Sequence, residues 1–404
     1  MIDAKGTNSR YIKNRNRYVI LEFVRVNGPV TKAEIADKTD LTFTAINNIV
    51  EQLTQEGYIR ETGYAVSSGG RKPVLLDINS EAVYTVGVQL NTLIVKTAVV
   101  NFKGVPVIQE EAPIFDLTDR DAIVGVIIAA IETLISRSGL TRDKLAGIGV
   151  ASPGPLDPNQ GVILSPPNLP GLAAVPLRQV LEDKFRLPVK VEKDANVMAL
   201  SELWYGACRG LSNIVYIDAD LGIGSGIILG RQIYSGFPYG AGEIGHGTID
   251  LDGPRCNCGN FGCLEAVASG MAVVRRAGEE IRRGAVSSLS ALYRENEQAL
   301  DISAVIEAAK QQDPLAIRLL GESARYVGIA LANVINLLAP EAIVVGGLLA
   351  NDYPPYYEQV RGIALERSFA SIQNAFMLRP SELKHLAGVI GAGTLPLERY
   401  LLSE

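Results

Sequence analysis

The stretch GEIGHGTIDLDGPRCNCGNFGCLEA, residues 242–266, contains three of the chain's four cysteines and one of its two histidines. Cys256, Cys258 and Cys263 follow the spacing C-x-C-x4-C, and His246 lies ten residues before the first of them. Three thiolates and one imidazole make a tetrahedral zinc set, and the glycines within the segment let so short a loop turn around an ion. We therefore predict a structural Zn²⁺ bound by these four side chains.

If all four positions ligate, no coordination site remains for an activated water, so we expect no metal catalysis. The alternative is a reduced loop without metal, in which Cys256 and Cys258 interact. Few and crowded cysteines favour metal ligation in a reducing compartment over a disulfide framework. The start of the chain does not resemble a secretion signal, and apolar runs such as 122–131 are too short to span a bilayer. The expected location is the cytoplasm, with no membrane partner.

The composition indicates a globular protein of more than one domain. The chain has 404 residues, with 47% hydrophobic and 20% charged side chains, which suits a large core. The net charge of −6 is unevenly distributed, because residues 1–72 carry +3 and the remainder carries −9. A basic amino-terminal segment on an acidic body favours contact with a polyanion such as nucleic acid.

Helical periodicity runs through residues 14–28, 31–39 and 41–59. Thr31 and Glu34 fit a capping box at the start of the second helix. Three short helices, the last two separated by a tight turn, resemble a helix-turn-helix. Two extended runs, 58–66 and 72–79, then form a hairpin with a glycine-rich tip, which is typical of the winged variant.

The third helix and the hairpin supply the candidate DNA contacts. Small and amide side chains early on the helix can enter a major groove, and cations near the tip can contact phosphates. The predicted DNA-binding residues are Thr42, Thr44, Ala45, Asn47, Asn48, Arg71 and Lys72. Arg10, Lys13, Arg15 and Arg17, ahead of the first helix, could add contacts. The alternative for this segment is a small dimerisation or substrate-capping domain.

Residues 83–404 show an internal duplication. Residues 83–107 predict three strands, followed by a helix at 119–137 and a buried strand at 145–152. Residues 216–236 repeat the strand, glycine-rich turn and strand, and Gly222, Gly224 and Gly226 would let backbone amides approach a phosphate. Two such halves facing one cleft describe the actin-like ATPase fold of sugar kinases.

Several segments together resemble the ROK family (repressors, open reading frames and kinases). They are ASPGPLDPNQGVIL (151–164), PNLPGL (167–172), VEKDANVMALSELWYG (191–206), DLGIGSGIILGRQIYSG (220–236), GEIGH (242–246), CNCGNFGCLEA (256–266) and EAIVVGGLLA (341–350). The resemblance implies an α/β protein with a winged helix-turn-helix before a two-lobed, actin-like body. We expect the head at 1–80, the first lobe at 81–194 and the second lobe at 195–404, with a carboxyl-terminal helix returning to the first lobe.

The resemblance also indicates that kinase chemistry is lost. Kinases of this family carry D-x-G-G-T in the first hairpin, for the Mg-nucleotide and its phosphates. Here Gln89 replaces the aspartate, Asn91 and Thr92 replace the glycines, and Leu93 replaces the threonine. A neutral amide is a poor magnesium ligand. Asp194 still matches the kinases' general base, but with no phosphoryl donor in place we expect no enzyme.

By the same resemblance, sugar hydroxyls are bound by Asn168, Asp194, Glu243, His246 and Glu265. Carboxylates suit sugars because they accept two hydroxyl donors at once. His246 would use one ring nitrogen for the metal and the other for a hydroxyl. The family's usual asparagine before the aspartate is Lys193 here, which can only donate, so the preferred sugar or the orientation of Asp194 can differ.

The expected function is therefore a sugar-responsive DNA-binding transcriptional regulator, a repressor of carbohydrate-utilisation genes. A homodimer or homotetramer would read a pseudo-palindromic operator. The effector (xylose, glucose, N-acetylglucosamine or another sugar), the operator sequence and the sign of the response stay open. The alternatives are a sugar kinase with an accessory head, and a body that binds a partner protein such as a phosphotransferase component.

Overall fold

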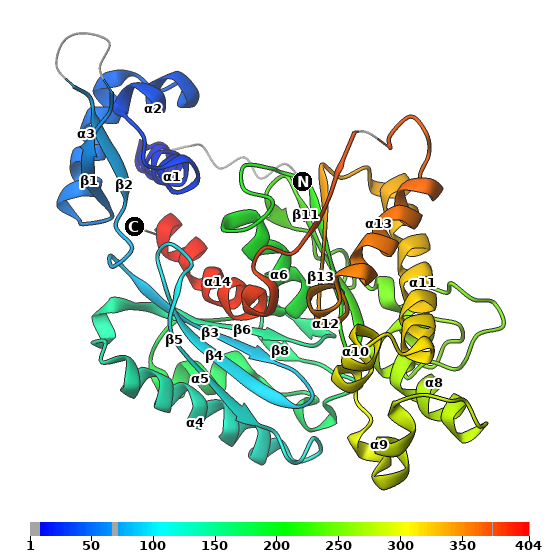
Figure 1. Cartoon of the computed structure of the whole chain (residues 1–404). Helices are drawn as coiled ribbons and strands as arrows, with labels where there is room; N and C mark the ends of the chain where they lie inside the picture. Colours follow the sequence, from blue (N-terminus) through cyan, green and yellow to red (C-terminus); the bar gives the residue numbers. More distant parts are fainter. Residues whose placement is uncertain (1–8, 67–71, 374, 404) are drawn as a thin grey trace.

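The computed structural model describes residues 9–66, 72–373 and 375–403. The first part is a small head of three helices and one hairpin, at the upper left of Figure 1. Its elements are α1 (Ser9–Asn27), α2 (Lys32–Thr39), α3 (Phe43–Gln55), β1 (Ile59–Tyr64) and β2 (Val74–Ile78). The antiparallel pairing of β1 and β2 confirms the predicted hairpin. Its tip, which includes Arg71, lies outside the described residues.

Local capping explains where the head helices begin. The Thr31 hydroxyl accepts from the Glu34 amide at 3.3 Å, and the Glu34 carboxylate accepts from the Thr31 amide at 2.6 Å, so the predicted capping box is confirmed. Thr42 caps α3 by accepting from the Ala45 amide at 3.3 Å. The helix buries an apolar face, which consists of Ile46, Ile49, Val50 and Leu53.

The predicted placement of four basic residues ahead of the first helix is wrong. Arg10, Lys13, Arg15 and Arg17 lie within α1, which begins before the predicted residue 14. Arg17 is only 8% exposed. It forms an ion pair with Glu56 and lies 5.5 Å from the centre of the Tyr58 ring. This guanidinium therefore stabilises the packing of α1 on α3 and is not available to a DNA phosphate.

The body contains two five-stranded sheets of similar construction. The first has the order β5-β4-β3-β6-β9 and the second the order β12-β11-β10-β13-β14. Each pairs an antiparallel hairpin with parallel strands beside it, which confirms the predicted two-part α/β architecture. The strands of the first sheet are β3 (Tyr84–Leu90), β4 (Ile94–Asn101), β5 (Pro106–Pro113), β6 (Leu145–Ser152) and β9 (Val189–Lys193). Those of the second are β10 (Ile214–Ala219), β11 (Ile223–Leu229), β12 (Gln232–Ile233), β13 (Ala342–Gly346) and β14 (Met377–Pro380). A small separate pair consists of β7 (Leu156–Asp157) and β8 (Val162–Ile163).

Helices cover both faces of the two sheets (Figure 1). The α-helices of the body are α4 (Arg120–Ser138), α5 (Leu177–Phe185), α6 (Asp194–Trp204), α7 (Leu264–Ala268), α8 (Gly270–Arg282), α9 (Leu289–Glu295), α10 (Ile302–Lys310), α11 (Pro314–Leu338), α12 (Leu348–Asp352), α13 (Pro354–Arg367) and α14 (Ala387–Ser403). Short 3₁₀ turns include η3 (Ile244–His246) and η5 (Lys384–Leu386). Side chains of α6 and α14 share one apolar cluster with the head and with β10 and β13, so these two helices occupy the centre of the molecule.

Glycines let α14 approach the first sheet closely. A Cβ atom on Gly87 would lie 1.9 Å from the Val389 carbonyl oxygen, and one on Gly149 would lie 1.8 Å from that of Ala392. No larger residue fits these two strand positions. The contact places the carboxyl-terminal helix against β3 and β6 (Figure 1). The domain boundaries after residues 80 and 194 stay predictions.

Within residues 9–66, 72–373 and 375–403, no helix is both long enough and apolar enough to cross a bilayer.

Candidate functional site

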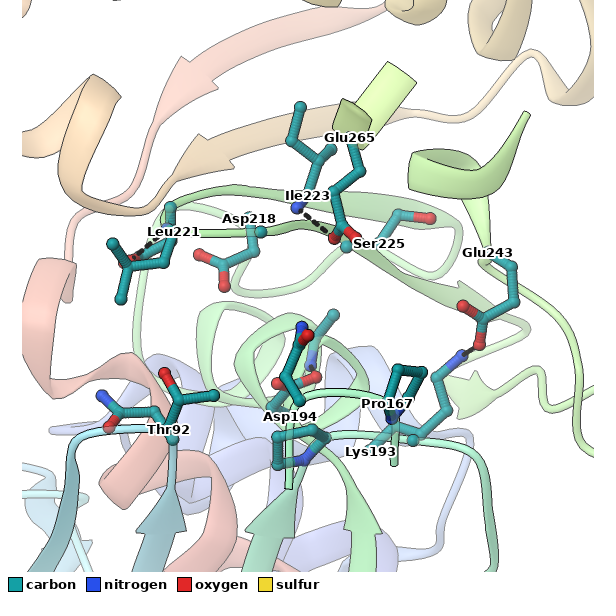
Figure 2. A pocket seen from close by; sticks show the side chains of 18 of the residues that line it. Thr92, Pro167, Lys193, Asp194, Asp218, Leu221, Ile223, Ser225, Glu243 and Glu265 are labelled. Atoms are coloured by element: carbon teal, nitrogen blue, oxygen red, sulfur yellow. Dashed lines mark hydrogen bonds and ion pairs between the residues drawn. The ribbon is translucent and has the colours of Figure 1, made fainter. Parts of the chain in front are cut away.

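A cavity of about 190 Å³ lies between the two sheets, at the ends of β3, β9 and β10. Figure 2 shows Asp194, Lys193 and Pro167 on one side of it and Asp218, Ile223 and Glu265 on the other. All five predicted sugar-binding residues line this cavity, although they come from segments up to about a hundred residues apart. They are Asn168, Asp194, Glu243, His246 and Glu265.

Asp194 is the first residue of α6, directly after β9. One carboxylate oxygen accepts from the Ala195 amide at 2.7 Å, which leaves the other free for a ligand. Burial raises the pKa of Asp194 to about 6, although the Ala195 hydrogen bond and Lys193 act in the opposite direction. The nearby charges of Glu243 and Asp220 add to the rise in this pKa. The carboxylate is thus ionised at neutral pH and becomes protonated under mildly acidic conditions.

Glu265 and the turn between β10 and β11 depend on each other. The Glu265 Oε2 atom accepts from the Ile223 amide at 3.0 Å. A Cβ atom on Gly222 would lie 2.7 Å from the same oxygen, so the glycine makes room for the carboxylate. This hydrogen bond fixes the orientation of Glu265 and leaves its second oxygen at the cavity (Figure 2).

Lys193, the departure from the family pattern, is buried at the edge of the cavity. Its side chain is 8% exposed, and the Nζ atom donates to Glu243 Oε1 at 2.5 Å and to the Ala241 carbonyl at 2.8 Å. Glu243 itself is 45% exposed. The contact joins the end of β9 to the segment before η3 across the cavity (Figure 2). One oxygen of a predicted sugar-binding carboxylate is therefore occupied by the lysine ammonium.

Two further carboxylates line the cavity and were missed by the sequence analysis. Asp218 and Asp220 stand at the end of β10. Burial, then the charges of Asp220 and Asp194, raise the pKa of Asp218 well above its ordinary value. Burial also raises the pKa of Asp220, against hydrogen bonds from the Leu221 and Leu348 amides. The sequence could have indicated these two carboxylates, because they directly precede the glycine-rich turn. Only the glycines of that turn were assigned a function.

The first hairpin differs from a phosphate-binding loop in its hydrogen bonding. The Asn91 side-chain oxygen accepts from the Leu93 amide at 2.8 Å and from the Ile94 amide at 2.7 Å. Backbone amides of this turn are therefore already satisfied by a side chain, as in an Asx turn. Gln89 lines the cavity and packs against Gly388, where an added Cβ would lie 2.3 Å from the amide carbon of Gln89.

Glycines of the second hairpin allow close packing contacts that the sequence did not predict. A Cβ atom on Gly226 would lie 2.0 Å from the Ala195 carbonyl oxygen, so this glycine allows α6 to pack closely on β11. Gly222 makes room for Glu265. Gly224 is the least constrained of the three, since an added Cβ would meet the Ala195 Cβ at an ordinary 3.5 Å. Two of the three predicted phosphate-approach glycines thus serve packing in this structure.

The predicted metal ligands come together beside the cavity. One ligand atom from each of His246, Cys256, Cys258 and Cys263, hereafter the metal cluster, lies within 4.8 Å of all the others. The Cys258 and Cys263 sulfurs are 3.7 Å apart, as are the Cys256 sulfur and His246 Nδ1. Tetrahedral bonds of about 2.3 Å separate neighbouring ligands by about 3.7 Å. The donor types and their spacing therefore fit a tetrahedral zinc ion.

The predicted DNA-contacting residues lie on or beside α3. Thr42, Thr44 and Asn48 are exposed, Ala45 and Asn47 are half-buried, and Lys72 is exposed at the start of the described part after the hairpin tip. Thr42 already uses its hydroxyl to cap the helix. Thr44 and Asn48 offer small and amide side chains to a groove, and the exposed face of α3 also includes Phe43 and the acidic Glu51.

The model of the ROK family matches residues 87–399. The chain belongs to the ROK family. A winged helix-turn-helix DNA-binding model matches residues 13–60, which correspond to the head. Together the two matches account for both parts of the structure and confirm the resemblance on which the sequence analysis relied.

The relatives differ in how much of this chain they match. A xylose repressor of Caldicellulosiruptor bescii is 30% identical over 384 residues, covering 95% of this chain and 96% of the repressor. A glucokinase of Halalkalibacterium halodurans is 35% identical over 316 residues, covering 77% of this chain and 94% of the kinase. A solved ROK family transcriptional regulator, described as a homolog of the E. coli MLC protein, matches at 28% identity with a TM-score of 0.80, covering 97% of this chain and 98% of that one. The ROK regulators thus match the whole chain, and the kinase matches about three quarters of it.

Proposed function

We propose that this protein is a sugar-responsive DNA-binding transcriptional repressor whose effector binds in a degenerate sugar-kinase cleft. The proposal is supported by a difference between the sugar side and the phosphate side of the cleft. The carboxylates expected on the sugar side are present, whereas the loop expected on the phosphate side has lost its acidic residue. A winged helix-turn-helix head precedes this cleft in the chain. A sugar bound in the cleft can therefore change how the protein binds DNA.

The protein is not an enzyme. Gln89 stands where the kinases carry an aspartate, and an amide does not replace a carboxylate as a magnesium ligand. Asn91 occupies the Leu93 and Ile94 amides of the adjacent turn, so these donors are not offered to a phosphate. Asp194 retains the place of a general base, but the residues that would hold a Mg-nucleotide in the first hairpin are replaced. A relative named as a xylose repressor and a solved transcriptional regulator, both matching nearly the whole chain, agree with this assignment.

The sugar is assigned to the cavity lined by Asp194, Glu243 and Glu265, to which Asn168 and His246 also contribute. Each carboxylate retains one oxygen that its protein partner does not use, and a sugar hydroxyl can donate to it. The carbohydrate class follows from this excess of acceptors over donors. Xylose, glucose and N-acetylglucosamine are the first candidates to compare.

The metal cluster would bind a structural Zn²⁺. Such an ion supplies a rigid cross-link between η3 and the loop before α7, and with four protein ligands it leaves no position for an activated water. Cys263 directly precedes α7, the helix that carries Glu265, and His246 lines the cavity. The conformation of the loop that carries the metal cluster therefore determines how Glu265 and His246 are oriented toward the sugar.

The head is assigned to operator DNA. The start of α3 would enter the major groove with Thr44, Ala45, Asn47 and Asn48, while Arg71 and Lys72 of the wing contact phosphates. Two heads on a homodimer, or on pairs within a homotetramer, would read a pseudo-palindromic site. The place of action is the cytoplasm, where the thiols of the metal cluster stay reduced.

Two measurements on the same purified chain test the proposal. A thermal-shift screen of sugars is expected to find a carbohydrate that raises the unfolding temperature, because a ligand of the native state stabilises it by mass action. Asp194→Asn should lose the shift, and Asp183→Asn, a change on the surface of α5, should keep it. Incubation with Mg-ATP and the same sugars should yield no sugar phosphate. Stoichiometric turnover would instead identify a kinase with an accessory head.

A further inference from the structure

The DNA-binding head is fastened to the body by a buried arginine. The Arg25 side chain, near the end of α1, is 3% exposed. Its Nη1 atom donates to the Trp204 carbonyl oxygen at 2.5 Å, and its guanidinium lies 4.2 Å from the centre of the Trp204 ring and 5.4 Å from that of Tyr205. One side chain thus makes a hydrogen bond and two cation–π contacts to the same end of one body helix.

A second arginine, from the body, completes this joint. Glu22 on α1 accepts two hydrogen bonds from Arg25, both at 2.7 Å, and also forms an ion pair with Arg231 of the turn between β11 and β12. Arg231 in turn donates to the Leu211 carbonyl at 3.1 Å. The bidentate pair between Glu22 and Arg25 fixes the plane of the guanidinium. The joint is therefore oriented by polar contacts in addition to apolar packing.

The body helix in this joint is α6, and its other end lies in the cavity. Asp194, its first residue, lines the cavity together with Ala195 and Met198, whereas Trp204, its last residue, lies under Arg25. Eleven residues at 1.5 Å rise place the two ends about 15 Å apart. One buried, continuous helix therefore connects the proposed sugar contact to the contact with the head.

Close packing prevents α6 from absorbing a displacement locally. A Cβ atom on Gly226 would meet the Ala195 carbonyl at 2.0 Å, and one on Gly391 would meet the Val197 carbonyl at 1.9 Å. Near the other end, Glu202 accepts from the Ser381 hydroxyl at 2.5 Å and from the Leu383 amide at 3.2 Å. Closely packed interiors transmit a shift of one part to the next instead of deforming continuously.

We propose that Arg25 is a positioning residue, which couples the orientation of the DNA-binding head to the state of the cleft through α6. The proposal rests on the proposed function and specifies how it is regulated. Helix α1 packs on the predicted recognition helix α3 within one apolar cluster, which includes Ile20 and Val24 on α1 and Ile46 and Val50 on α3. A change in how Arg25 meets Trp204 therefore reorients α3 and alters the spacing of two heads on their operator.

The chain provides its own reporter, because Trp204 is its only tryptophan. Emission excited at the red edge of the tryptophan absorption band, where the 15 tyrosines do not absorb, therefore reports on the surroundings of Trp204. The probes are xylose, glucose and N-acetylglucosamine, and the DNA is a duplex selected from a random library by the full-length chain. For the sugar that changes operator affinity, we expect Trp204 emission to change with the same sugar dependence. If the sugar changes operator affinity fully while Trp204 emission stays unchanged, the proposal is refuted. This test needs only the wild-type chain.

Arg25→Lys tests the joint directly, since lysine keeps the charge but loses both the fork and the stacking plane. Arg60→Lys, on the exposed face of β1, is the matched control within the head. We expect Arg25→Lys to bind sugar with unchanged affinity. The ratio of operator affinities with and without sugar should fall from about tenfold or more to within about twofold of one. The control should keep the wild-type ratio.

The outcomes separate the two claims. If no sugar alters operator binding by the wild-type chain, the proposed function fails. If the wild type responds and Arg25→Lys responds equally, the function stands and the role of Arg25 is refuted. A loss of sugar binding in Arg25→Lys would also contradict the proposal, because a positioning residue in the head must leave the cleft intact.

Discussion

Replacing Lys193 by asparagine should strengthen the binding of a neutral sugar. In the structure the Lys193 ammonium occupies one oxygen of Glu243 at 2.5 Å. A sugar that donates two hydroxyls to Glu243 must first displace this contact. Asparagine restores the residue type usual in the family and still offers an amide donor to the ligand. The substitution therefore removes a competitor for Glu243, and it also removes the donor to the carbonyl of the half-buried Ala241.

The expected size of the effect follows from the exposure of the two side chains. Fully exposed ion pairs contribute about 0.2–1 kcal/mol, and breaking a fully buried one costs about 3–5 kcal/mol. Lys193 is buried but Glu243 is 45% exposed, so solvent screens the pair and an intermediate value applies. About 1–2 kcal/mol corresponds to a Kd that is lower by about 5- to 30-fold.

Isothermal titration of the effector at pH 8 measures this change. The alkaline pH matters because Lys193 lowers the pKa of Asp194, and the substitution would otherwise change the ionisation of that carboxylate too. Lys184→Asn is the matched control, since Lys184 pairs with Glu132 at 2.6 Å with both side chains about half exposed. A Kd that is unchanged or higher in Lys193→Asn would refute the competition between lysine and sugar, and would indicate that Lys193 contacts the ligand itself.

Three further predictions concern the metal, the pH dependence and the packing. Complete removal of zinc by a chelator, verified by atomic absorption, should lower the unfolding temperature and abolish the sugar-induced shift; a preserved sugar response in the metal-free chain would disconnect the metal cluster from the cavity. Because burial raises the pKa of Asp194 to about 6, sugar affinity should fall by about tenfold per pH unit below pH 6 and level off above pH 7. The raised pKa also means that the ionised carboxylate costs stability at neutral pH and that protonation relieves the cost as the pH falls. Asp194→Asn should therefore unfold at a higher temperature than the ligand-free wild type at pH 7. A lower unfolding temperature would contradict the conclusion that the ionised carboxylate destabilises the fold. Gly149→Ala should lose about 3 kcal/mol or more in urea unfolding, because its Cβ would lie 1.8 Å from the Ala392 carbonyl, whereas Gly125→Ala in α4, with open space around its Cβ position, should gain about 0.5–1 kcal/mol.

Features that depend on nearby residues could be predicted from the sequence. The capping box at Thr31 and the fully buried strand at 145–152 are both present in the structure. Each is decided by contacts within a few residues, where turn chemistry and periodicity determine the conformation. The C-x-C-x4-C spacing likewise requires that the three thiols lie close to one another.

Contacts between distant segments could not be predicted in the same way. Lys193 and Glu243 are fifty residues apart in sequence, and their pairing depends on how the two sheets face each other. The burial of Arg17 against Tyr58 depends on how α1 packs in the head. The role of Gly226 becomes visible only with α6 in place. In each case a residue with a common local role has a partner that only the tertiary structure determines.

The affinity of the full-length chain for its selected operator duplex, measured with and without sugar at fixed salt concentration, tests the central claim most directly. The salt must be fixed because phosphate contacts make any such affinity depend on ionic strength. The account predicts that one carbohydrate changes the operator Kd by about tenfold or more and that Asp194→Asn abolishes this change while DNA binding persists. An operator affinity that no carbohydrate alters, or a chain that selects no sequence from the library, would contradict it.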